Sequence, residues 1–248
     1  MTLSTARKVL ASCLVLPPVI WALANLIGPN TPDGSSTNDQ ITTLNKIADH
    51  KSAFVASGIL FLVGSLLFLI ATYGIVHVYR GLKVGVGQVA GGLLALAMSV
   101  FVMFYGFGIT QYEMINHAEF KTVATQHSFA RLLHFSQSSG LGAVVFITFI
   151  LGIVLGPILL GTAMLRRRNV PVWAGVLTIL TGPVGFVLSG KAANTVFQLF
   201  LLAALTPLAM VIWRMTDEQW DAPRAIAGAR QDGAVAPEPA APSPAPAV

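Results

Sequence analysis

Six long apolar segments alternate with short polar segments along the chain. They cover residues 9–27, 53–76, 89–109, 141–165, 170–188 and 196–213, and none contains Asp, Glu, Lys, Arg or His. About 20 apolar residues in a helix cross the hydrocarbon core of a bilayer, and a helix satisfies its own backbone hydrogen bonds there. The pattern therefore predicts an all-α, polytopic transmembrane bundle of six helices, in one domain that covers residues 1–220.

The first apolar segment has a second interpretation as a cleavable signal peptide. Arg7 and Lys8 precede it, and Ala22-Leu23-Ala24 resembles a cleavage site. Its length and the pair Pro17-Pro18 in its middle favour a retained helix. Cleavage would leave five helices and the same orientation.

The cationic residues are distributed unevenly between the polar segments. With the N-terminus in the cytoplasm, ten lie on the cytoplasmic side: Arg7, Lys8, Arg80, Lys83, Arg166, Arg167, Arg168, Arg214, Arg224 and Arg230. Five lie on the outer side: Lys46, Lys51, Lys121, Arg131 and Lys191. Because Lys and Arg concentrate in cytoplasmic loops, we expect both termini in the cytoplasm.

Aromatic residues near the ends of the apolar segments agree with this orientation, because Trp and Tyr prefer the membrane interfaces. Tyr79, Trp173 and Trp213 are expected at the inner interface, and Trp21 and Tyr112 near the outer one.

Two of the predicted outer loops are long, and each contains a helical pattern. In the loop 28–52, Ile41, Leu44 and Ile47 recur at helical spacing and predict a short helix within residues 39–49. In the loop 110–140, a polar stripe predicts a helix at the membrane surface. This stripe consists of His127, Arg131 and His134.

Composition supports a membrane protein and excludes several other classes. Only 10% of the residues are charged, against about 25% in soluble domains. The net charge of +5 is explained by the positive loops, and no basic stripe with interleaved aromatics indicates nucleic-acid binding. The single cysteine, Cys13, excludes an intramolecular disulfide and a cysteine metal cluster. Residues 221–248 are rich in Ala and Pro and predict a disordered cytoplasmic tail.

The apolar segments contain little that could carry chemistry. Ionisable residues inside a membrane usually mark ion or proton paths, and here Asn25 and Gln198 are the most polar side chains in the segments. Gly-x-Ser-x-Gly, His-Glu-x-x-His and phosphate-binding glycine motifs are absent from the sequence. We therefore expect a protein without enzymatic activity.

The candidate ligand-binding residues lie on the predicted outer side. His50 and His134 stand at matching positions before two apolar segments, each two residues ahead of a serine. Two such histidines could ligate a haem iron axially, and the alternative is ordinary polar residues at helix ends. Glu113 and His117 are four residues apart and could share a metal ion, although a surface ion pair is the simpler interpretation.

Small residues at spacing four recur twice, as Gly87-x-x-x-Gly91 and Gly152-x-x-x-Gly156. Such pairs let helix backbones approach closely. The spacing is explained by packing within one chain or by association of two copies through either pair, as a homo-oligomer.

The stretch from Asp49-His50-Lys51 through Tyr79-Arg80-Gly81-Leu82-Lys83 to Gly91-Gly92 joins an outer polar start, an apolar helix, a short basic turn and a glycine-rich helix. This layout resembles a family of six-helix integral membrane proteins from high-GC, actinobacterial-type bacteria, a domain of unknown function. The resemblance covers the helical region, implies residence in the bacterial plasma (inner) membrane and implies no particular chemistry.

The function that these observations predict is that of a non-enzymatic accessory, interaction or small permease-like membrane protein without a cofactor. The lipid bilayer is its expected partner. The alternative is a haem- or metal-binding membrane redox protein that uses the outer histidines.

Overall fold

The computed structural model describes residues 2–29, 37–80, 85–116, 125, 127–128, 131, 139–187 and 190–221. Its helices are α1 (Leu3–Ile27), α2 (Thr37–Asp49), α3 (Lys51–Tyr79), α4 (Val86–Asn116), α6 (Gly140–Arg167), α7 (Val172–Val187), α8 (Lys191–Arg214) and α9 (Asp217–Asp221). No strand occurs in this part of the chain. The predicted all-α bundle is confirmed. The predicted tail, residues 221–248, lies outside the described residues apart from Asp221.

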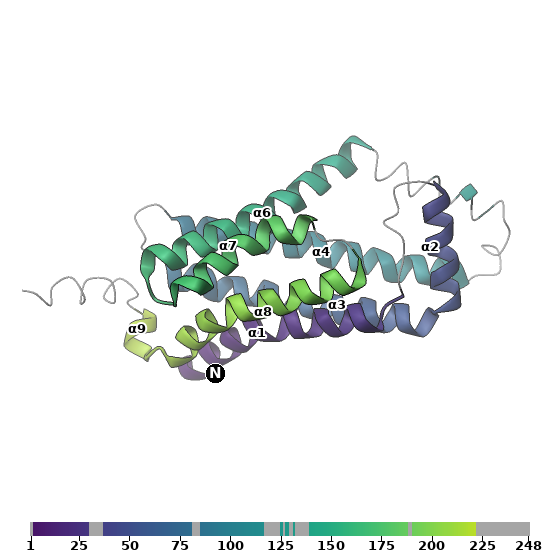
Figure 1. Ribbon diagram of the computed structural model, residues 1–248. Coiled ribbons are helices and arrows are strands. Elements are labelled where there is room, and N and C mark those ends of the chain that lie inside the picture. The colour runs from purple at the N-terminus through teal and green to yellow at the C-terminus, as the bar shows by residue number, and fades with distance from the viewer. Residues whose placement is uncertain are drawn as a thin grey trace, which may run out of the picture.

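Six apolar helices close into a ring. Each packs against the next in the order α1, α3, α4, α6, α7 and α8, and α8 packs against α1. Figure 1 shows α1, α3 and α8 below α6 and α7. The first and last apolar helices of the chain are therefore neighbours, and α1 is a member of the ring.

Five of the described helices are long and apolar enough to cross a membrane: α1, α3, the 86–106 part of α4, the 142–167 part of α6, and α8. The remaining apolar helix, α7, has 16 described residues and corresponds to the predicted segment 170–188. At a rise of 1.5 Å per residue it is about 24 Å long, shorter than the hydrocarbon core of about 30 Å. The described part of the chain thus contains six apolar helices, and five of them reach the length of a membrane span.

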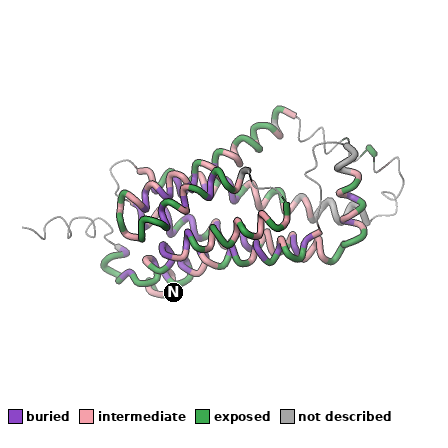
Figure 2. The backbone as a smooth tube through the Cα atoms, in the orientation of Figure 1, coloured by how far each residue is buried: buried purple, intermediate pink, exposed green. Residues whose placement is uncertain are grey.

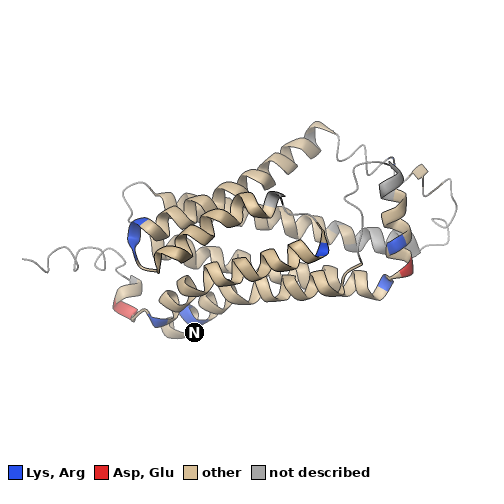
Figure 3. Ribbon diagram, viewed as in Figure 1, with Lys and Arg blue, Asp and Glu red and all other residues tan. Residues whose placement is uncertain are grey.

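Apolar side chains cover much of the outer surface of the ring as well as its interior (Figure 2). Val144 is 59% exposed and Ile70 is 49% exposed, whereas Leu14 and Ile75 inside the ring are fully buried. The described Lys, Arg, Asp and Glu residues lie toward the ends of the bundle (Figure 3). An apolar belt between charged ends is the surface expected of helices that face lipid.

Glycines bring the helices of this one chain close together. A side chain at Gly87 or Gly91 of α4 would collide with Tyr79 or Val76 of α3. Side chains at Gly152 and Gly156 of α6 would meet α4 in the same way, at Ala97 and Leu94. The two predicted Gly-x-x-x-Gly faces are thus occupied by helices of the same chain.

Two aromatic residues that we expected near the interfaces are buried between helices. Trp21 is 6% exposed and packs against Phe68 of α3 and Phe101 of α4. Its indole nitrogen donates to the Phe61 carbonyl at 3.3 Å. Tyr79 has no exposed surface. Neighbouring helices enclose both side chains, so they do not face lipid, and the predicted level of Trp21 and Tyr79 in the membrane stays a prediction.

The predicted helix within residues 39–49 is confirmed as α2. Leu44 and Ile47 are buried, Ile41 is half-buried, and α2 packs against α3 and α4. The first residues of the predicted second outer loop, 110–116, are helical, since α4 continues to Asn116.

Candidate functional site

The histidine pair considered for haem is only partly within the described residues. His50 is the residue before α3, is exposed, and makes no side-chain capping hydrogen bond. His134 lies outside the described residues, so the structure does not define its distance from His50.

The predicted metal-binding pair, Glu113 and His117, is also only partly within the described residues. Glu113 belongs to the last two turns of α4, and only its backbone is described. His117 lies outside the described residues. Within the described ranges, no group of three or more His, Cys, Asp and Glu residues could hold a metal ion.

The end of the bundle that carries the start of α1 also carries most of the described positive charge. We call it the basic end, and its cations are Arg7, Lys8, Arg80, Arg166, Arg167, Arg168 and Arg214. The opposite end carries Lys46, Lys51 and Lys191 (Figure 3). The Lys191 ammonium donates to the carbonyl of Gly28, which follows α1, at 2.9 Å.

A short helix, α9, closes the basic end. Thr216 precedes it and accepts a hydrogen bond from the Gln219 amide at 3.2 Å, while the Gln219 side chain accepts from the Thr216 amide at 3.1 Å. This reciprocal pair is a capping box, which starts a helix by satisfying otherwise unpaired amides.

Trp220 attaches α9 to the end of α3. Its ring stacks on His77 with centroids 4.0 Å apart. Its carbonyl accepts from Arg80 at 2.8 Å and from His77 Nε2 at 2.8 Å. With the proton on Nε2, His77 Nδ1 accepts from the Arg80 guanidinium at 3.2 Å. These three residues lock the chain after α8 onto α3, and we call them the α9 clamp.

An ion pair between Arg7 of α1 and Asp217 adds a second attachment of α9. The Arg7 side chain is 7% exposed and the Asp217 side chain 60%. Beside this pair, the Lys8 ammonium lies 5.8 Å from the centroid of the Trp213 ring. The N-terminal turns of α1 are therefore joined to α9 by the ion pair and to the last turn of α8 by the Lys8–Trp213 contact.

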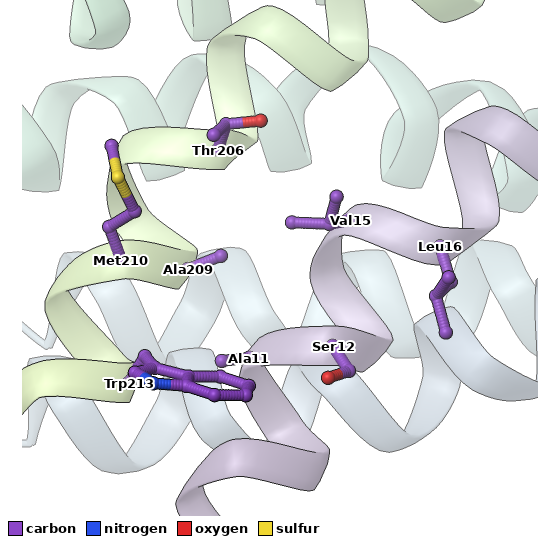
Figure 4. Close-up of a pocket in the computed structure, with 8 residues that line it drawn as sticks. All are labelled: Ala11, Ser12, Val15, Leu16, Thr206, Ala209, Met210 and Trp213. Atoms are coloured by element: carbon purple, nitrogen blue, oxygen red, sulfur yellow. The ribbon is translucent and has the colours of Figure 1, made fainter.

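A groove of about 270 Å³ runs between α1 and α8, next to these contacts. Figure 4 shows its lining, which comprises Ala11, Ser12, Val15, Leu16, Thr206, Ala209, Met210 and Trp213. All are apolar except Ser12 and Thr206, and the Thr206 hydroxyl donates to the Leu202 carbonyl of its own helix at 2.7 Å. We call this feature the α1/α8 groove.

Sequence reasoning did not find the clamp or the groove. The sequence signal for α9 was available, because Thr216 and Gln219 stand at capping-box spacing. Trp220 stands among the charged residues Asp217, Glu218 and Asp221 and is nevertheless buried. The groove had no sequence signal, because it exists only where α1 meets α8.

The fold and these features define an all-helical membrane-type bundle with a capped basic end and a lateral apolar groove. Neither protein-family models, nor curated proteins, nor solved structures give a match to this chain.

Proposed function

We propose that this chain is a non-enzymatic, multi-pass protein of a bacterial plasma membrane that acts as an accessory or interaction protein. The observation that carries the proposal is the apolar packing inside the ring. The six apolar segments contain no Asp, Glu, Lys, Arg or His, and the buried polar side chains of the described core are five hydroxyls and Arg7, which lies at the basic end. An ion or proton path through a membrane normally requires ionisable groups.

The buried hydroxyls support an interaction role over a permease-like role. Ser65 donates to the Phe61 carbonyl at 2.8 Å, and Thr178 donates to the Ala174 carbonyl at 2.7 Å. Thr72 and Thr181 likewise donate to carbonyls of their own helices. Because these hydroxyls are already bonded within their helices, they provide few groups for a solute, and the lipid-exposed surface is the more suitable place for binding.

The charge distribution supports an orientation with both termini in the cytoplasm. The basic end holds seven described Lys and Arg residues, against four in the rest of the described chain: Lys46, Lys51, Arg131 and Lys191. Positive residues close to membrane spans favour the cytoplasmic side. The start of α1 and α9 both lie at the basic end (Figure 1).

Cysteine labelling in intact cells tests the orientation. Cys13 is buried and is first replaced by alanine, which leaves a background without thiols. Single cysteines at Ser35, Leu82 and Thr125 are then treated with a membrane-impermeant maleimide. We expect labelling at 35 and 125, and labelling at 82 only after permeabilisation. Labelling at 82 in intact cells would overturn the orientation.

Proton flux into vesicles tests the interaction role against transport. Purified protein is reconstituted with an internal pH dye, and a potassium gradient with valinomycin supplies the driving force. We expect proton entry at the rate of protein-free vesicles. Gln198 of α8 has a buried side-chain oxygen without a described partner. Faster entry that Gln198→Leu abolishes would identify a transport path and refute the interaction role.

A further inference from the structure

We propose that the α1/α8 groove binds one acyl chain of an anionic phospholipid, and that Lys8 and Arg214 hold its phosphate. The inference deepens the proposed function by naming a partner, and its assignment to the cytoplasmic leaflet rests on the proposed orientation. The length of the groove, its apolar lining and the charges at its mouth all support the proposal.

The groove has the length and lining of an acyl-chain site. From Trp213 to Thr206 it follows α8 for seven residues, or about 10 Å. One leaflet contributes about 15 Å of hydrocarbon, so the groove is long enough to hold about the first two-thirds of an acyl chain. Leu16, Met210 and Trp213 are each about half exposed and form its open side. A chain can therefore enter laterally from the bilayer.

Two cations continue the groove lining toward the membrane surface. Lys8 lies one turn before Ser12 on α1, and Arg214 lies one turn after Met210 on α8. Residues four apart share a helix face, so both cations belong to the groove's side of their helices. Trp213 stands between these cations and the apolar part of the groove, as expected of an aromatic at the headgroup level.

The charge at this mouth is not neutralised by the described residues. Arg7, next to Lys8, is paired with Asp217. Within the described ranges neither Lys8 nor Arg214 forms an ion pair. Basic pockets beside transmembrane helices on the cytoplasmic side bind anionic headgroups. A zwitterionic lipid would fill the same groove but would gain no electrostatic binding energy from Lys8 and Arg214.

A phospholipid fits this site better than a transmembrane helix of another protein. The groove extends over only about two turns of each helix, and a second helix would pack along a longer strip. Lys8 and Arg214 favour an anion at one end of the groove, and the apolar lining favours hydrocarbon along the rest. This combination is the chemistry of a lipid with a negative headgroup.

Native mass spectrometry of the full chain in nonionic detergent tests the proposal. The probes are phosphatidylglycerol and phosphatidylcholine with identical acyl chains. We expect tighter binding of phosphatidylglycerol. Each cation near an anionic lipid contributes about 1 kcal/mol, so Lys8→Gln should weaken this binding about fivefold and the Lys8→Gln/Arg214→Gln double variant about 25-fold. The control Arg166→Gln removes a charge from the same end on α6 and should change binding little.

A second pair of variants tests the groove itself. Ser12→Phe fills the groove and should abolish the specific site for both lipids. Val144→Phe places the same side chain on the exposed face of α6, away from the groove lining, and should leave binding intact. Circular dichroism confirms that each variant is folded. Because binding in detergent does not depend on orientation, labelling from the wrong side would refute the proposed orientation and leave the site standing.

Three results would overturn the lipid site. The first is equal binding of the two lipids by the unmodified protein. The second is a loss with Arg166→Gln or Val144→Phe as large as that with the groove variants. The third is a photo-crosslinker at position 12 that attaches in cells to another protein and to no phospholipid. Lipid adducts at position 12 that fall with Lys8→Gln support the proposal.

Discussion

Replacing Trp220 by alanine should release α9 from the bundle. The side chain is 5% exposed, and its ring stacks on His77 at 4.0 Å. The alanine variant keeps the carbonyl that accepts from Arg80 and His77 but loses the buried ring. Removing a buried aromatic side chain costs about 3–5 kcal/mol. An isolated helix of five residues is unstable in water, so α9 depends on this contact for its structure.

The free energy lost with the Trp220 ring can be measured as local opening of α9. Since about 1.4 kcal/mol is a factor of ten, the equilibrium constant for docking of α9 should fall by about two to three and a half orders of magnitude. Hydrogen exchange of α9 amides reports this directly, including the Trp220 amide, which donates to the Thr216 carbonyl at 3.0 Å. We expect α9 protection to collapse while amides of α3 keep theirs, because the ring of helices is unchanged.

Trp213→Ala is the matched control, because Trp213 lies at the end of α8 but is 50% exposed and takes no part in the clamp. This variant should leave α9 protection near that of the unmodified protein. Unchanged α9 exchange in Trp220→Ala, or an equal loss in Trp213→Ala, would refute the reasoning that the buried ring anchors α9.

Two further predictions concern the glycine contacts and the histidines. Gly91→Leu should destabilise the bundle by about 1–3 kcal/mol in a detergent unfolding assay, because its side chain would meet Val76, whereas Gly92→Leu next to it meets nothing and should be tolerated. An effect of Gly91→Leu on association alone, with unchanged stability, would instead favour the dimer interpretation. Purified protein should show no Soret absorption band and no stoichiometric metal; a Soret band that disappears in both His50→Ala and His134→Ala would establish the haem alternative.

The helices themselves follow from local patterns in the sequence. Long runs without charge predict membrane-length helices, because in hydrocarbon the backbone must satisfy its own hydrogen bonds. The spacing of Ile41, Leu44 and Ile47 predicted α2 for the same local reason. The extension of α4 beyond residue 109 was missed, because a helix that leaves the membrane no longer needs to be apolar.

The arrangement of these helices follows from contacts between residues far apart in the sequence. In the folded chain Trp21 packs against Phe68 and Phe101, and Tyr79 packs against Gly87 of α4, so other helices enclose both rings. The Gly-x-x-x-Gly spacing likewise does not determine whether that face packs against a helix of the same chain or of another copy.

The candidate sites depend even more on such contacts. The sequence by itself determined the helical class, the apolar spans and the charged ends, since these depend on backbone and side-chain solvation along a single segment. Only the tertiary structure decided that α1 lies beside α8, which makes the groove, and that Trp220 reaches His77 across 143 positions of sequence. Both features are contacts between distant segments, and side-chain packing rather than local pattern selects them.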